Sequence, residues 1–304
     1  MIKEELSSKK KGKPLIGPAQ KAKPRPEISI WDKIDLLRMH ILRSLGLVSA
    51  IGIVFFIFHK WLFTHVVFAP SEADFVTYRL ACAFSKLIGA GDMICIEPPV
   101  FNKIAIGFGE PFIMSIEVSF LTGLLISIPF VIWELAKFVG ALIPERQRKS
   151  INNIVLACSL LFAAGVAFGY FLLAPLSINW LMGYTVPGVE NTPSLSSYIN
   201  YMVIFTLPMG LIFQLPVICY FLARIGLLGE DSMREYRRHT IVGILVLAGI
   251  ITPTVDGLTQ LLVAFPLYLL FEGSIFVVAR GRRLYEAEEP EEEDDSLMAE
   301  KGAV

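Results

Sequence analysis

Long apolar runs separated by short charged segments dominate the chain. A transmembrane helix needs about 20 apolar residues rising 1.5 Å each, because the hydrocarbon core of a bilayer is about 30 Å thick. Six runs meet or approach this length, at residues 41–68, 111–142, 151–182, 198–224, 240–252 and 257–279. The fifth is short, since residues 240–252 rise only about 20 Å as a helix. The pattern therefore predicts an all-α integral membrane protein with six transmembrane helices.

Composition agrees with this class. Of the 304 residues, 54% are hydrophobic and 18% are charged, and the mean hydropathy is +0.61; these values are typical of membrane proteins. The net charge of −1 hides an asymmetry, because residues 1–25 are basic and residues 286–295 are almost wholly acidic. Such biased tails are typical of disorder. The sequence predicts a membrane domain at 29–285 between two disordered tails.

Lysine and arginine residues in the short loops indicate the orientation. They follow the second, fourth and sixth runs, whereas residues 183–197 and 253–256 contain none. Loops rich in these residues stay in the cytoplasm. Both termini are therefore predicted to be cytoplasmic, as six spans require.

Residues 31–43 precede the first run and place apolar positions 34, 37, 41 and 42 on one stripe, with charges elsewhere. This spacing predicts an amphipathic helix at a membrane surface. The residues alone leave open whether that helix does more than anchor the terminus.

The fourth run carries a polar residue, Gln214, near its middle. A buried amide without a partner costs roughly 1–3 kcal/mol, so Gln214 should face protein or a wet cavity. Pro208 and Pro216 predict a bent helix, and Gly210 is expected to leave open space on the same face. We interpret this as a bent helix that lines a cleft. The alternative, in which Gln214 only joins two helices, stays open.

Few other ionisable residues lie at membrane depth. Glu134 and Lys137 are three residues apart near the end of the second run, which favours a simple ion pair. Glu272 lies deep enough in the sixth run to need a partner. Asp256 begins that run, where an N-cap role is a sufficient explanation, and Gln260 shares its face one turn later.

The segment 70–110 is the largest excursion on the outer side and contains Cys82 and Cys95. An oxidising compartment would permit a disulfide between them, but free thiols remain an alternative. No metal-ligand spacing involves any cysteine. The chain has no serine-hydrolase elbow, His-Glu-x-x-His motif or glycine-rich phosphate loop. We therefore expect no enzyme activity, no cofactor and no metal.

Five stretches in the region 31–285 together resemble the TatC family, the multispanning subunit of the Sec-independent twin-arginine protein translocase. They occur in the family's order, and they are residues 138–149, 165–175, 213–216, 251–260 and 264–272. The resemblance implies a glove-shaped bundle with a concave membrane face and short last two spans. It also implies the cytoplasmic (inner) membrane of a bacterium.

The function implied by the resemblance is that of a receptor. It would bind twin-arginine signal peptides, gather single-span TatA- and TatB-like partners into an oligomeric complex, and export folded proteins on the proton-motive force. No nucleic-acid partner is expected. A six-span small-solute transporter is the alternative, because polar groups and broken helices near the bilayer midplane also coordinate cargo.

Departures from the family pattern shape the expected signal-peptide site. Family members usually carry glutamate where this chain has Leu36 and Gln147. Carboxylates accept guanidinium groups bidentately and more strongly than amides do, so the nearby acids Asp35 and Glu145 are expected to take over the contact. The alternative is that these acids only balance neighbouring arginines. The whole expected site comprises Asp35, Arg38, Glu145, Gln147 and Arg148.

A second expected site lies within the membrane. The family usually has glutamate at position 214, and Gln214 cannot titrate. We expect Gln214 to line the concave face and offer partner helices a hydrogen bond. The expected polar site for partners comprises Gln214, Asp256, Gln260 and Glu272.

Overall fold

The computed structural model describes residues 30–72, 74–87, 103–142, 151–184, 186–188, 191–252 and 257–301. Within these ranges the chain is almost wholly helical, and the β structure there is limited to one isolated bridge between Ile104 and Ser194. Five helical stretches of the described part are long and apolar enough to cross a membrane: 34–57, 110–138, 152–183, 195–224 and 259–283. The short fifth predicted span corresponds to α11 (Arg237–Ile251). The six-helix membrane fold is therefore confirmed.

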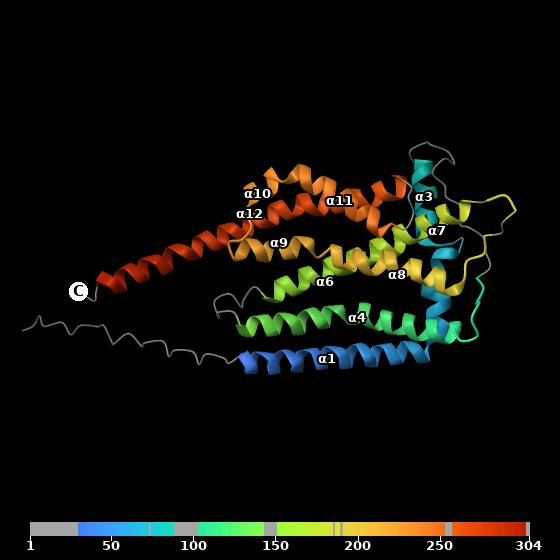
Figure 1. Ribbon diagram of the computed structural model, residues 1–304, viewed down its shortest axis with the longest axis horizontal. Coiled ribbons are helices and arrows are strands. Elements are labelled where there is room, and N and C mark those ends of the chain that lie inside the picture. Colours follow the sequence, from blue (N-terminus) through green and yellow to red (C-terminus); the bar gives the residue numbers. More distant parts are fainter. Residues whose placement is uncertain are drawn as a thin grey trace, which may run out of the picture.

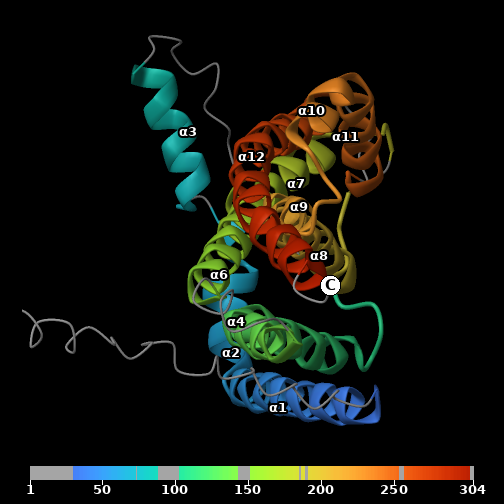
Figure 2. The same ribbon diagram turned by 90° about the vertical axis from the view of Figure 1, so that its left-hand side faces the viewer.

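The long helices run side by side along one axis (Figure 1). Helix α1 (Ile30–Ile57) packs on α4 (Glu110–Leu142), which packs on α6 (Ile151–Phe168). Helix α6 packs on α8 (Leu195–Ile212), and α9 (Leu215–Arg224) packs on α12 (Gly257–Lys301), which also contacts α11. Viewed along the axis, α1 and α4 form one edge of the bundle, far from α11 (Figure 2).

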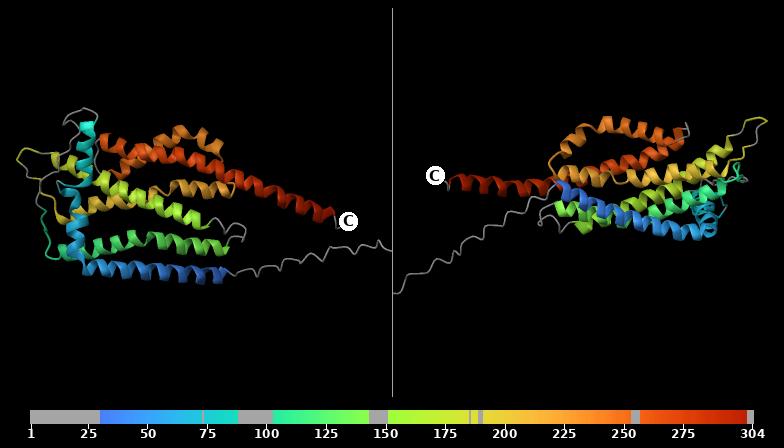
Figure 3. Two further views of the ribbon diagram at one scale, coloured as in Figure 1. Left: turned by 180° about the vertical axis from the view of Figure 1, so that it is seen from behind. Right: turned by 60° about the horizontal axis from the view of Figure 1, so that its bottom comes forward.

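The two ends of the bundle differ. Helix α1 begins and α12 leaves the bundle at the same end, which we call the terminal end (Figure 1). The opposite end carries α3 (Val76–Leu87), which stands across the long helices, and we call it the α3 end (Figure 3). Helix α10 (Glu230–Glu235) lies at the terminal end, before α11.

The first span differs from its expected boundaries. The segment predicted as an amphipathic surface helix is continuous with the span in α1, which ends at Ile57 rather than at residue 68. No proline interrupts residues 30–57, so the helix propagates through both segments. Three short helical pieces follow it: α2 (His59–Leu62), the π-helix η1 (Phe63–Val67) and the 3₁₀ helix η2 (Ala69–Ser71).

The third span is one helical path with a local change of winding. Helix α6 passes into the π-helix η3 (Gly169–Leu173) and then into α7 (Ala174–Gly183). Pro175 lies in the first turn of α7, where a missing amide proton costs little.

Helix α12 continues through the acidic segment to Lys301. Glu, Leu, Met and Ala are good helix formers, and extending a helix that already exists avoids the cost of nucleation. The basic tail at 1–28 lies outside the described residues.

Buried side chains concentrate toward the α3 end. The main cluster joins α8 to η1, η3 and α12, and its members include Leu62, Leu173, Phe205, Met209 and Val263, all fully buried. A smaller cluster holds α9, α10 and α12 together around Ala223, Met233, Ile275 and Val278. Helix α1 contributes little buried surface, so its position depends mainly on α4.

Three buried or half-buried tyrosines link helices at the α3 end. Their hydroxyls donate to backbone carbonyls of residues 66–70, where the helix of the first span has broken into short pieces. Tyr170 bonds Val66 at 2.6 Å, Tyr198 bonds Val67 at 2.8 Å and Tyr78 bonds Pro70 at 3.0 Å. Each bond satisfies a carbonyl that regular helix would otherwise have used.

The segment before α4 is attached to the start of α8. Glu110 accepts bonds from the amides of Ile106 and Gly107 at 2.7 and 3.0 Å, and from the amide of Ser196 at 2.8 Å. An acidic side chain is favourable at the positive N-terminal end of a helix. The carboxylate therefore joins the segment before α4 to the start of α8.

Candidate functional site

The fourth span breaks at Gln214. Helix α8 ends at Ile212, residues 213 and 214 form a turn, and α9 begins at Leu215 with Pro216 in its first turn. Pro208, in contrast, lies inside α8 without ending it. The predicted bend is confirmed, and it lies at the second proline.

Gln214 joins two helices. Its Nε2 donates to the backbone carbonyl of Cys158 on α6 at 3.1 Å. The expected open space beside it is absent, because a Cβ at Gly210 would lie 2.7 Å from Phe162 and 2.9 Å from Val166. The prediction of open space was wrong, since α6 packs directly on this face. The bond to Cys158 favours the helix-joining interpretation of Gln214.

A large cavity lies elsewhere on the bundle. Its volume is about 800 Å³, it is open on one side, and it is lined by residues of α1, α2, η1, η2, α3, α4, α6, η3 and α8. Most of its lining is apolar, with Thr122, Ser159 and Thr206 as polar members. Glu72 and Asp74 line it toward the α3 end. Gln214 is not among the lining residues, so the polar break and the cavity are separate features.

Two of the expected partner-site residues join α11 to α12. Gln260 donates from its Nε2 to the carbonyl of Leu245 at 2.9 Å. Glu272 accepts from Arg237 at 2.5 Å and from the Tyr268 hydroxyl at 2.7 Å. The expectation that Glu272 needs a partner is confirmed. Asp256 lies outside the described residues.

A cluster of charged groups joins α1 to α4 at the terminal end. Glu134 is 4% exposed, and its Oε2 bonds Nδ1 of His40, which is 14% exposed. Its Oε1 lies 3.4 Å from Nζ of Lys137, as the spacing predicts. Lys137 also lies over the ring of Trp133, with Nζ 3.1 Å from the ring centroid. Each oxygen of this buried carboxylate therefore faces a base.

Sequence reasoning missed His40. The apolar stripe at 34, 37, 41 and 42 predicted a helix at a membrane surface, and Ile34, Ile41 and Leu42 are at least half exposed. The face toward α4 instead carries the half-buried positions 36, 37, 40 and 44. The signal that could have indicated this pair is a histidine at helical spacing from Leu36 and Leu37, together with a glutamate inside the second apolar run.

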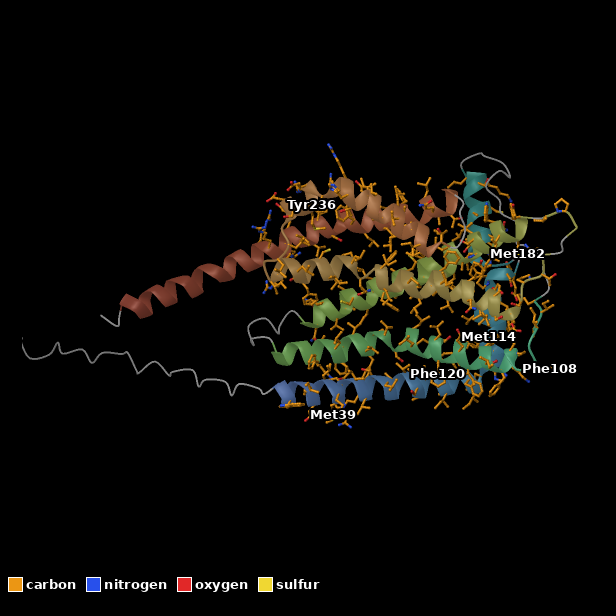
Figure 4. All side chains as sticks on the ribbon, viewed as in Figure 1. Met39, Phe108, Met114, Phe120, Met182 and Tyr236 are labelled. Atoms are coloured by element: carbon orange, nitrogen blue, oxygen red, sulfur yellow. The ribbon has the colours of Figure 1, made fainter. Side chains whose placement is uncertain are left out.

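Asp35 and Arg38 lie on the other side of α1. A helix turns about 100° per residue, so both residues project about 140–160° away from His40. Both are exposed. Helix α1 therefore packs on α4 with one face and presents the two expected signal-peptide residues on the opposite face. Figure 4 shows this end of α1, with Met39 directed away from α4.

The remaining expected residues are only partly described. Glu145, Gln147 and Arg148 lie outside the described residues, in the connection from α4 to α6. Cys82 is disulfide-bonded, and Cys95, its expected partner, lies outside the described residues. The free cysteines of the described part are Cys158 and Cys219. That part contains no group of three or more His, Cys, Asp or Glu residues able to hold a metal.

Comparison with known proteins identifies one family. The family described as Sec-independent protein translocase protein (TatC) matches residues 32–266. The TatC protein of Blattabacterium sp. subsp. Periplaneta americana is 29% identical over 256 residues, which cover 83% of this chain and 95% of that protein. The protein of the same name from Deinococcus radiodurans is 28% identical over 269 residues, which cover 88% of this chain and 92% of that protein.

A solved structure shares the fold. The crystal structure titled as the twin arginine translocase receptor TatC superposes with a TM-score of 0.61 at 24% identity. The match covers 82% of this chain and 99% of that one. Because the family match extends over most of the chain and the helical bundle agrees with it, this protein belongs to the TatC family.

Proposed function

We propose that this chain is the twin-arginine signal-peptide receptor and core subunit of a translocase that exports folded proteins across the cytoplasmic membrane of a bacterium. The family match over residues 32–266 carries the proposal. The driving force would be the proton-motive force, and the chain itself would catalyse no reaction. The terminal end would face the cytoplasm, since the loops there are rich in lysine and arginine.

The signal peptide would bind at the terminal end. Asp35 and Arg38 are exposed there on α1, and the connection that carries Glu145, Gln147 and Arg148 leaves α4, the helix on which α1 packs. The two acids would accept the paired guanidinium groups bidentately, and Gln147 would add hydrogen bonds. Exposure of Asp35 supports this role, because a buried acid would be closed to a peptide.

Complementation tests the function directly. We would express the chain in a bacterial strain that lacks its own translocase and score export of a folded reporter with a twin-arginine signal. The expected result is export with paired arginines and none with paired lysines. Equal export of both reporters, or none from a correctly inserted chain, contradicts the proposal. Solute uptake by liposomes that contain only this chain would favour a transporter instead.

Crosslinking tests the assigned residues. The double variant Asp35→Ala, Glu145→Ala should lose crosslinking to a twin-arginine peptide. Asp74→Ala is the matched control, because Asp74 is an exposed acid at the α3 end. Unchanged crosslinking in the double variant would show that the two acids only balance neighbouring arginines.

The partner helices would bind the intramembrane polar residues Gln214, Asp256, Gln260 and Glu272. A primary amide has two donor hydrogens and an acceptor oxygen, so the bond from Gln214 to Cys158 leaves capacity for a TatA- or TatB-like helix. Gln214→Leu should weaken partner association and leave membrane insertion intact. Transport at the original rate by Gln214→Leu would contradict this role.

A further inference from the structure

The contact between α1 and α4 at the terminal end depends on one buried carboxylate. Helix α1 has little other cover. Near its beginning, the described polar contact to α4 is the bond from His40 to Glu134, and Phe138 lies edge-on to the imidazole with ring centroids 6.3 Å apart. A helix held mainly by one neighbour can rotate about its axis unless a directional contact prevents it. The His40–Glu134 bond is such a contact.

Rotation of α1 matters because its two faces differ. His40 faces α4, and Asp35 and Arg38 project about 140–160° away from it. When the imidazole is bonded to Glu134, the face with Asp35 and Arg38 must point away from α4. If that bond were lost, α1 could turn and bring these side chains toward its neighbour.

We propose that His40 and Glu134 are positioning residues, and that their ion pair locks the rotation of α1 so that Asp35 and Arg38 are presented to a twin-arginine peptide. This inference rests on the proposed function. The lock is also pH-dependent. Histidine changes its charge between about pH 5 and 8, and a charge-assisted hydrogen bond is roughly twice as strong as a neutral one. The lock is therefore strongest while the imidazole is protonated and Glu134 is ionised, and it weakens as the pH rises.

The charged groups around this pair are few in the described part of the chain. Helix α4 contributes Glu134, which belongs to the pair, and Lys137, which contacts Glu134. Helix α6, on the other side of α4, contributes the neutral Asn152 beside Trp133. On α1 itself the neighbouring charges Asp35, Arg38 and Arg43 are exposed. Glu134 therefore has a base at each oxygen, His40 from α1 and Lys137 from its own helix.

The first measurement reports the rotation without any peptide. Nitroxide labels would replace Leu42 on α1 and Leu135 on α4, which are both exposed, in the full chain with Cys158 and Cys219 changed to Ala. In lipid bilayers we expect a narrow distance distribution near pH 6 and a broader one near pH 8.5. His40→Arg should give the narrow distribution at both values, because a guanidinium keeps its charge. Glu134→Gln should give the broad distance distribution at both pH values.

The second measurement is binding of a twin-arginine peptide to the same proteins. We expect affinity to fall by up to about tenfold between pH 6 and pH 8.5, which corresponds to 1.4 kcal/mol. His40→Arg should abolish this dependence and keep the tighter affinity. His59→Gln is the matched control, because His59 begins α2, beyond the end of α1 that is far from His40, and bonds the carbonyl of Phe56 at 2.9 Å; it should keep the tenfold change.

The outcomes distinguish failure of the rotational lock from failure of the proposed receptor function. Distance distributions that do not respond to pH, or that respond equally in His40→Arg, overturn the lock. A pH-dependent affinity that persists in His40→Arg overturns it as well. Distances that respond as expected while no variant binds the peptide at any pH support the lock and overturn the proposed function. His40→Arg carries the test if Glu134→Gln fails to insert.

Discussion

The two ends of the bundle are joined by different chemistry. At the α3 end, tyrosine hydroxyls donate to backbone carbonyls, and the three tyrosines concerned are buried or half-buried. At the terminal end, carboxylates pair with bases, as Glu134 does with His40 and Glu272 with Arg237. Neutral bonds to carbonyls do not change with pH or salt in the physiological range, whereas ion pairs do. The contacts of the α3 end therefore keep their strength as pH and salt change, whereas those of the terminal end depend on charge.

This difference matches the division of roles that we propose. A ligand with paired arginines is recognised by charge, so its receptor must expose carboxylates and bases where it binds. The opposite end needs only to hold α1, α6 and α8 at fixed distances. Stability lost at the α3 end should therefore affect the whole bundle, while changes at the terminal end should affect mainly recognition.

The largest effect is expected where helix backbones approach most closely near the α3 end. A Cβ on Gly169 would collide with the carbonyl of Phe205 and lie 2.9 Å from the Cα of Thr206. Gly169→Ala should lower the free energy of unfolding by about 3 kcal/mol, because the backbone of α8 must move. Unfolding in mixed detergent micelles measures this.

Gly243→Ala is the control for that variant. Nothing lies within 4 Å of a Cβ at Gly243 on α11, and alanine is favoured over glycine in a helix by about 0.5–1 kcal/mol. This variant should be neutral or slightly stabilising. Equal losses in both variants would show that close approach at Gly169 is not the cause.

A smaller effect is expected from one of the tyrosine hydroxyls. Tyr198 is 2% exposed, and its hydroxyl donates to Val67 at 2.8 Å. Tyr198→Phe should cost about 2 kcal/mol, since it leaves a buried carbonyl without its partner. The cost should be the same at pH 6 and pH 8. Tyr184→Phe, at an exposed ring, should cost nothing measurable. A loss of stability in Tyr198→Phe that varied with pH would contradict the claim that the α3 end is insensitive to pH in this range.

The buried tyrosines of the α3 end should respond to strongly alkaline pH. Burial raises the pKa of Tyr78 from 10.0 to about 12. Below pH 10 the hydroxyl is protonated in both folded and unfolded chains, so stability is unaffected. Between pH 10 and 12 the unfolded chain releases this proton and the folded chain keeps it, so stability falls, by about 1 kcal/mol at pH 11. A Tyr78→Phe variant should lack this fall; the same fall in both proteins would assign it to another group.

Sequence reasoning recovered the spans because hydrophobic length is a local property. Residues 111–142 are apolar whatever surrounds them, and Pro216 interrupts a helix wherever the helix lies. The short fifth span could be predicted for the same reason. Family resemblance added the glove-shaped arrangement, which no single segment encodes.

Contacts between helices could not be predicted in the same way, because they depend on rotation. His40 and Glu134 are 94 positions apart, and Tyr198 and Val67 are 131 apart. Whether two such residues meet depends on which face each helix turns to its neighbour, and the apolar stripe on α1 does not indicate that face. In a membrane, an apolar side chain is stable against lipid as well as protein, so hydrophobicity alone does not indicate the packed face.

The smallest expected effect concerns the second ion pair of the terminal end. Arg237 and Glu272 are 47% and 23% exposed, so water screens their attraction, and Arg237→Gln should cost only about 0.5–1 kcal/mol. The loss should shrink as salt is raised from about 0.05 to 1 M, because the Debye length then falls to about 3 Å. Arg79→Gln is the control, since its pair with Asp74 is 3.6 Å long and both side chains are exposed. It should cost nothing at either salt concentration. Unlike the His40 pair, the Arg237 pair should be insensitive to pH between 6 and 8.5, because a guanidinium keeps its proton throughout. A pH-dependent loss at Arg237 would mean that His40 is not the source of pH sensitivity at this end.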